Sequence, residues 1–267
     1  MRLPSKSLTA NPLNSVSSEG GERIAKIIAR AGLCSRRDAE RWILDGRVSV
    51  NGKTLESPAF TVGPADKIVV DGRPLPAPEA PRLFLYHKPV GLVTTARDEK
   101  GRATVFDHLP QELPRVVSVG RLDLNSEGLL LLTNDGGLAR YLELPANALK
   151  RCYRARVHGE VNAARLAALA RGITVDGMRY GPVEARIEGG RGANVWIAVT
   201  LKEGKNREVR KVMAHLGLQV NRLIRTAYGP FQLGDLPAGS AKEVPPHTLK
   251  ENLPGYFTQR SQLPSGR

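Results

Sequence analysis

The sequence predicts an α+β protein made of two folded units, a small helical and stranded module followed by a larger unit with a mixed or antiparallel sheet. Three observations predict this. Helical spacing followed by short alternating strands fills residues 22–75, four prolines crowd residues 74–81, and strand-like runs dominate residues 82–250. The length of 267 residues suits roughly two domains. The longest uncharged apolar run, Gly128–Leu132, is far shorter than a membrane span of about 20 residues.

The first folded unit is expected to begin at Glu22, after a disordered leader over residues 1–21 that is rich in Ser, Asn, Pro and Gly. Apolar residues at helical spacing predict a first helix that Gly32 ends: Ile24, Ile27, Ile28 and Ala31. Ser35, with Asp38 three residues later, predicts a capping box that opens a second helix. Short strands follow at 48–50 and 66–70, each closed by a turn signal.

Prolines mark the boundary between the two units, because Pro74, Pro76, Pro78 and Pro81 permit neither a helix nor a central strand. We therefore expect a linker at 76–81. In the second unit strand-like runs recur at 83–87, 116–119, 129–132, 153–157, 182–187, 195–201 and 223–231. Helical patterns occur at 163–170 and 206–216. The polar tail, 251–267, is expected to be flexible.

The charge balance indicates a polyanionic partner. The formal net charge is +14 and the sequence pI is near 10.2, which favours nucleic acid over a membrane surface. Aromatic residues make up only 5% of the chain, so a surface built mainly on stacking rings is disfavoured. Two distant cysteines, Cys34 and Cys152, suit a reducing cytoplasm. Neither they nor the scattered histidines have metal-ligand spacing, so no metal site is expected.

The segment from Arg23 to Glu40, followed by Gly46–Lys53, resembles the S4 RNA-binding domain over about residues 22–75. Apart from that likeness, Arg23, Lys26 and Arg30 form a basic face on the first helix, and a solvated face is the plain alternative. The resemblance implies RNA contacts that position the nucleic acid more than they specify it. With Arg30 added from the basic face, the implied contact residues are Arg23, Lys26, Arg30, Ser35, Arg36, Arg37, Arg47 and Asn51.

The most informative segment is 120–136, where Gly-Arg-Leu-Asp is followed by Gly-Leu-Leu-Leu-Leu-Thr-Asn-Asp-Gly. By itself Asp123 beside Arg121 is typical of a loop salt bridge. The whole segment resembles the signature of pseudouridine synthases of the RsuA/RluB type, which carry an N-terminal S4 domain, and it is most similar to the RluB-like members. Stretches 87–91, 150–157, 203–211 and 223–230 match further motifs in order, so the resemblance covers about residues 22–245.

The resemblance implies a role for each matched residue. Asp123 would be the nucleophile, at the ribose C1′ or at the base, and Tyr153 would stack on the target uracil. Arg210 would pair with Asp123, and Arg121 would fill the space left by the extruded base or hold the backbone. The basic region around 202–225 would line an RNA groove. The RNA-binding candidates of the larger unit are Lys88, Lys205, Arg207, Lys211 and Arg225.

The expected function is therefore isomerisation of uridine to pseudouridine in ribosomal RNA, with the large subunit favoured over the small. The reaction adds no atom and needs no redox change, so no cofactor is expected, and no nucleotide-binding loop is present in the sequence. A non-catalytic S4-type assembly factor is the alternative from another class. The expected partner is ribosomal RNA, free or in a precursor particle, and a monomer is the default state.

Overall fold

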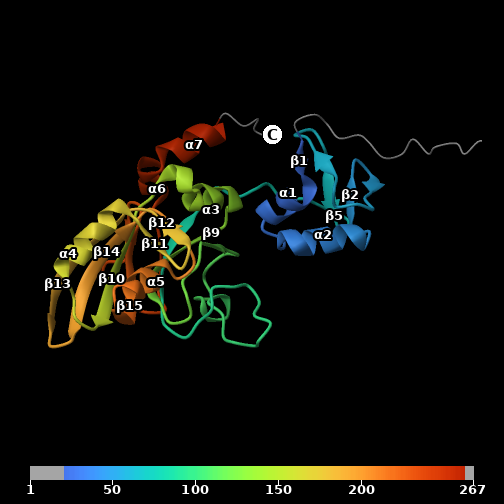
Figure 1. Cartoon of the computed structure of the whole chain (residues 1–267). Helices are drawn as coiled ribbons and strands as arrows, with labels where there is room; N and C mark the ends of the chain where they lie inside the picture. Colours follow the sequence, from blue (N-terminus) through green and yellow to red (C-terminus); the bar gives the residue numbers. More distant parts are fainter. Residues whose placement is uncertain (1–20, 262–267) are drawn as a thin grey trace, which may run out of the picture. The chain divides into compact units, whose positions relative to one another are not determined.

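The computed structural model describes residues 21–261, which fall into two compact units, one ending at Glu79 and the other running from Ala80 to Arg260 (Figure 1). Of the predicted leader only Gly21 lies within the described residues. The α+β fold class is confirmed in both units. No helix within 21–261 is long and apolar enough to cross a bilayer.

The N-terminal unit packs two helices on short strands. Its helices are α1 (Ile24–Arg30) and α2 (Arg36–Leu44). A four-stranded antiparallel sheet has the order β3-β2-β5-β6, with β2 (Val48–Val50), β3 (Lys53–Thr54), β5 (Ile68–Val70) and β6 (Arg73–Pro74). A second pair joins β1 (Glu22–Arg23) to β4 (Thr61–Val62). Ile24, Ile28 and Ile43 are fully buried between the helices and the strands.

The capping box predicted for the second helix is present. Ser35 Oγ accepts the Asp38 N–H at 3.0 Å, and the Asp38 carboxylate accepts the Ser35 N–H in return. These two bonds satisfy main-chain donors that the first helical turn otherwise leaves unpaired. The Ser35 hydroxyl also donates to the same carboxylate at 2.6 Å. Ser35 therefore has a structural task in addition to its predicted contact with RNA.

The larger unit is built on a nine-stranded mixed sheet with the path β13-β14-β10-β15-β9-β7-β17. Its path strands are β7 (Leu83–Lys88), β9 (Glu127–Thr133), β10 (Arg151–His158), β13 (Val183–Arg191), β14 (Asn194–Leu201), β15 (Gln219–Tyr228) and β17 (Ala241–Glu243). Off this path β8 (Val117–Val119) pairs with β9, and β16 (Phe231–Gln232) pairs with β15. The central strands β9 and β15 run parallel, which makes the sheet mixed.

Helices and a hairpin cover parts of the sheet. One core cluster lies under α4 (Ala163–Ala168), α5 (Glu208–His215) and the hairpin of β11 (Ile173–Val175) with β12 (Met178–Tyr180). Another lies under α3 (Gly136–Glu143), α6 (Pro246–Asn252) and α7 (Pro254–Ser261). The predicted stripe on the 206–216 helix is confirmed, because Val209, Val212 and Met213 are buried in the first cluster.

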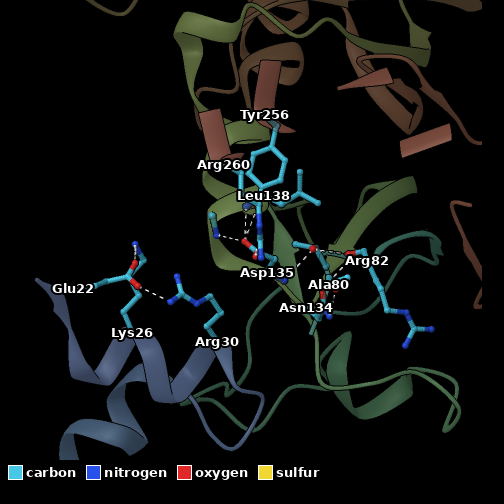
Figure 2. Close-up of polar contacts among 12 residues, drawn as sticks. Glu22, Lys26, Arg30, Ala80, Arg82, Asn134, Asp135, Leu138, Tyr256 and Arg260 are labelled. Atoms are coloured by element: carbon cyan, nitrogen blue, oxygen red, sulfur yellow. Dashed lines mark hydrogen bonds and ion pairs between the residues drawn. The ribbon is translucent and has the colours of Figure 1, made fainter. Parts of the chain in front are cut away.

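The prediction of a flexible tail is wrong for residues 251–261. This segment is helical, and Tyr256 is buried against the larger unit. Arg260 Nη1 lies 2.5 Å from Asp135 Oδ2, and the Tyr256 hydroxyl donates to the same carboxyl group (Figure 2). The polar composition of this segment suggested flexibility, but a few buried contacts are enough to order a segment. The remaining tail, 262–267, lies outside the described residues.

Helix α3 was not among the predicted helices, and it begins with two glycines, Gly136 and Gly137, which are poor helix formers. Asp135 Oδ1 accepts the N–H groups of Gly137 and Leu138 at 2.7 and 2.9 Å, which caps the helix at its N-terminus. Burial acts to raise the pKa of Asp135, but these hydrogen bonds and Arg260 outweigh it and lower that pKa. The carboxylate therefore joins the start of α3 to the end of α7.

Candidate active site

The candidate site is centred on a short loop between β8 and β9 that carries Arg121 and Asp123. Gly120 takes a left-handed φ of 64° where the chain leaves β8, a conformation that glycine adopts with little strain. The Ser126 N–H then closes a turn on the Asp123 carbonyl oxygen at 3.0 Å. The Asp123 carboxylate stays 30% exposed while Leu122, next to it, is buried. The loop thus exposes the Asp123 carboxylate while the neighbouring Leu122 is buried.

Two further hydrogen bonds, one from a side chain and one from the main chain, hold this loop in place. The Thr94 hydroxyl donates to the Leu122 carbonyl oxygen at 2.9 Å, and the Gly91 N–H donates to the Leu124 carbonyl oxygen at 2.8 Å. Both partners belong to the segment that follows β7. The Asp123 main chain is therefore fixed by contacts from residues about thirty positions earlier in the sequence.

Lys88 lies beneath this loop and is fully buried, so its predicted place on the RNA-binding surface is wrong. Its Nζ donates to the carbonyl oxygens of Pro89, Asp123 and Ser126 at 2.9, 3.2 and 2.9 Å. Three acceptors match the three N–H bonds of an ammonium group. Burial lowers the pKa of Lys88 to about 8, although Asp123 and Glu127 act in the opposite direction.

The cation that faces Asp123 is Arg207, not Arg210 as predicted. Arg207 Nη1 lies 3.5 Å from Asp123 Oδ2. Arg210 instead donates to the carbonyl oxygens of Asn125 and Val220, both at 2.8 Å. The two arginines lie at the start and in the first turn of α5, and which of them meets the carboxylate depends on how that helix begins. Arg210 remains close, because Asn125 belongs to the Asp123 loop.

A cavity of about 970 Å³ brings together three of the four predicted catalytic residues, all but Arg210, with Arg207, which was predicted to bind RNA. Arg121, Asp123, Tyr153 and Arg207 all line it, with Leu223 and the segment 93–102 forming further walls. Tyr153 comes from β10 and its side chain is half-buried, so the ring is held by packing yet borders the open space. Four residues spread over 87 positions of sequence therefore meet at one opening.

Arg225, which was predicted to bind RNA, is almost fully covered, because only 2% of it is accessible. Its Nε donates to the Leu129 carbonyl oxygen at 2.7 Å, and its guanidinium lies 5.1 Å from the centre of the Tyr228 ring. Arg151, which the sequence reasoning did not single out, lies over the same ring at 4.6 Å and donates to the Tyr228 hydroxyl. Both arginines line the cavity and add positive charge to it.

The other predicted RNA-binding residues of the larger unit differ in their contacts and their exposure. Lys205 pairs with Glu203 at 2.6 Å and donates to the Arg179 carbonyl oxygen at 2.7 Å. Lys211 is exposed on α5. The arrangement leaves Lys211 and the half-exposed Arg207 as the predicted cations most available to a phosphate.

In the N-terminal unit the predicted RNA contacts fall into two groups. Several already pair within the unit: Lys26 and Arg30 with Glu22 at 2.5 and 2.7 Å (Figure 2), Arg47 with Asp71, and Asn51 with Asp66. Arg23, Arg36 and Arg37 are exposed and make no ion pair with any residue in 21–261. These three have the larger free capacity for phosphate, and two of them open α2.

Comparison with known proteins matches both units of the chain to known families. Residues 82–215 match the family model described as RNA pseudouridylate synthase, and residues 22–68 match the S4 domain. An uncharacterized RNA pseudouridine synthase of Rickettsia felis is 49% identical over 84% of this chain and 96% of its own length. The ribosomal large subunit pseudouridine synthase B of Haemophilus influenzae is 43% identical over 84% of this chain and 65% of its own.

A solved structure is similar as well. A crystal structure of a pseudouridylate synthase superposes with a TM-score of 0.61 at 26% identity, covering 86% of this chain and 99% of that one. The similarity therefore extends across most of both chains in sequence and in fold. From these matches and the assembled cavity it follows that this chain belongs to the RNA pseudouridylate synthase family and is an isomerase of uridine in RNA.

Proposed function

We propose that this protein converts a uridine of large-subunit ribosomal RNA to pseudouridine, with Asp123 as the nucleophile. The observation that carries the proposal is the meeting of Asp123, Tyr153 and Arg207 around one cavity, with the Asp123 main chain held from below by Lys88. The choice of the large subunit is supported by relatives such as the Haemophilus influenzae enzyme, whose name states that substrate.

The chemistry requires few groups. The N1–C1′ bond of uridine breaks, the uracil turns, and a C5–C1′ bond forms, while the proton lost from C5 is balanced by one gained at N1. No electron is transferred, so a carboxylate nucleophile is sufficient and no cofactor is invoked. Attack at C1′ and attack at the base both place negative charge on the uracil. The arginines lining the cavity supply positive charge in a partly enclosed space.

The target base must leave its stack before a carboxylate can reach it. Tyr153 offers the extruded uracil a ring to stack on and is proposed to assist removal of the C5 proton. Arg121, exposed beside Asp123, is proposed to occupy the vacated space or to hold the RNA backbone. The exposed arginines of α2 and Lys211 are proposed to bind phosphates, an interaction that positions the RNA.

The decisive experiment compares the wild-type protein with Asp123→Asn. The substitution changes little volume but removes the nucleophile, so pseudouridine formation should fall by at least about a thousand-fold, while RNA affinity stays within a few-fold. Pseudouridine mapping across ribosomal RNA, from cells with and without each variant, reads out the target. Full activity of Asp123→Asn would refute the proposed nucleophile. A lost site in small-subunit RNA would correct the substrate, and no lost site would favour a non-catalytic assembly factor.

A further inference from the structure

The turn at 203–208 carries the cation that faces Asp123. Arg207 lies in the left-handed region, with φ 52° and ψ 32°, immediately before α5 begins. Such a conformation is strained for a residue with a side chain. It persists only where surrounding contacts hold the backbone.

Glu208 supplies the principal contact. Its Oε2 accepts the main-chain N–H of Lys205 at 3.0 Å, and its own N–H donates to the Lys205 carbonyl oxygen at 3.2 Å. These two bonds close a ring around residues 205–208, with Arg207 inside it. Only 4% of Glu208 is exposed, and within 21–261 its carboxylate makes no ion pair. Its one side-chain partner is thus the backbone of this turn.

The other side of the turn is anchored separately. The Lys205 side chain donates to the Arg179 carbonyl oxygen at 2.7 Å and lies over the Tyr180 ring. With one end tied to β12 and the other closed by Glu208, the turn has little freedom. Arg207 Nη1 is consequently held 3.5 Å from Asp123 Oδ2, although the arginine side chain itself is 46% exposed.

We propose that Glu208 is a positioning residue for the reaction, which holds Arg207 in the conformation that presents its guanidinium to Asp123. The inference rests on the proposed role of Asp123. The task requires an acceptor oxygen at the end of a side chain of this length and does not require a negative charge. Burial is also the largest influence on the pKa of Glu208 and raises it, although the Lys205 N–H and the charges of Lys205 and Arg151 act in the opposite direction.

Two substitutions separate the acceptor from the charge. Glu208→Gln keeps an acceptor oxygen and removes the charge, whereas Glu208→Met keeps the length and removes the acceptor. With RNA saturating, Glu208→Gln should keep the single-turnover rate within about two-fold. Glu208→Met should lower it by about ten- to a hundred-fold, since small misplacements of catalytic groups have effects of this size. RNA affinity should change little in either variant, and Glu251→Gln and Glu251→Met on α6 serve as exposed controls.

A double-mutant cycle tests whether Glu208 acts through Arg207. In the Arg207→Ala background, adding Glu208→Met should lower the rate by less than about two-fold, because the group that Glu208 positions is already absent. An equal loss in both backgrounds would overturn the inference. So would a Glu208→Gln variant that is as slow as Glu208→Met at an unchanged thermal midpoint.

A third variant tests whether the length of the side chain at position 208 matters. Glu208→Asp keeps the carboxylate but shortens it by one methylene, so it should be as slow as Glu208→Met, and a wild-type rate in this variant would also overturn the inference. The activity of Asp123→Asn distinguishes a failure of the proposed function from a failure of the proposed role of Glu208. An active Asp123→Asn would remove the proposed function. An inactive one, together with independent effects in the cycle, would remove only the role of Glu208.

Discussion

The Lys88 ammonium group donates to the carbonyl oxygen of Asp123, at 3.2 Å, from a position that solvent does not reach. A buried cation whose partners are neutral carbonyls is costly unless its hydrogen bonds are complete. Here all three N–H bonds have acceptors, two of them, Asp123 and Ser126, on the loop between β8 and β9. The structure therefore places a charged side chain in the interior, where it fixes the main chain that carries the Asp123 carboxylate.

This relationship predicts a pH dependence of stability. Folding lowers the pKa of Lys88 from 10.5 to about 8, so between these values the unfolded chain binds more protons and stability rises with pH. The cost of burying the cation is fully present below about pH 8 and is relieved as pH approaches 10.5. The free energy of unfolding of the wild type, minus that of Lys88→Met, should rise by about 3 kcal/mol across this window. Denaturant titrations at pH 7.5, 9 and 10.5 measure it, and a flat difference would contradict the burial of Lys88.

Gly128 lies between two buried cations in the sheet, since it is in register with Lys88 on one side and with Arg225 on the other. Its φ is 104°, and a Cβ there would lie 2.3 Å from the Arg225 carbonyl oxygen. Gly128→Ala should lower the free energy of unfolding by about 3 kcal/mol or more, from overpacking and backbone strain together.

Gly136→Ala is the matched control, because a Cβ at that position of α3 meets nothing within 4 Å. This variant should be neutral or stabilising by about 0.4–1 kcal/mol. Equal losses in the two alanine variants, measured by urea unfolding, would contradict the tight approach of β9 to β15.

The ion pair of Arg260 with Asp135 predicts that helix α7 contributes to stability. Arg260→Met should lower the free energy of unfolding by about 1–3 kcal/mol at neutral pH, since it removes hydrogen bonds to a buried carboxylate. Because the pKa of Asp135 is lowered, its stabilisation is present above its unfolded value and is lost as pH falls through the folded value. The difference from wild type should therefore shrink in acid. Arg171→Met, at an exposed position, is the control and should change stability by less than about 0.5 kcal/mol.

The exposed arginines of α2 predict a salt-dependent share of RNA binding. Replacing Arg36 and Arg37 with Ala should weaken binding and reduce the slope of log affinity against log salt by roughly 0.7–0.9 per lost phosphate contact. Replacing Arg47, which already pairs with Asp71, should reduce the slope less. Filter binding at several salt concentrations measures both. Equal slopes for the wild type, the Arg36/Arg37 double variant and the Arg47 variant would show that these arginines do not bind phosphate.

Local pattern was sufficient for much of the fold. The capping box at Ser35, the apolar stripe of the 206–216 helix and most strands of the large sheet follow from side-chain spacing alone. Spacing failed at α3 and α7, because Asp135 satisfies the first donors of one helix and pairs with an arginine 125 residues away in the other. A contact at that separation leaves no periodic trace in sequence.

The site shows the same division. The order of a carboxylate, a tyrosine and several arginines along the chain was enough to propose which residue types act on the uridine. Tertiary structure decided which arginine faces Asp123 and which cations are buried. Arg207, which takes a left-handed conformation just before α5, faces Asp123, whereas Arg210 in the first turn donates to carbonyl oxygens. Lys88 and Arg225 are both buried in the larger unit. Charge is a property of the residue, whereas its exposure and its partner depend on the atoms that folding brings around it.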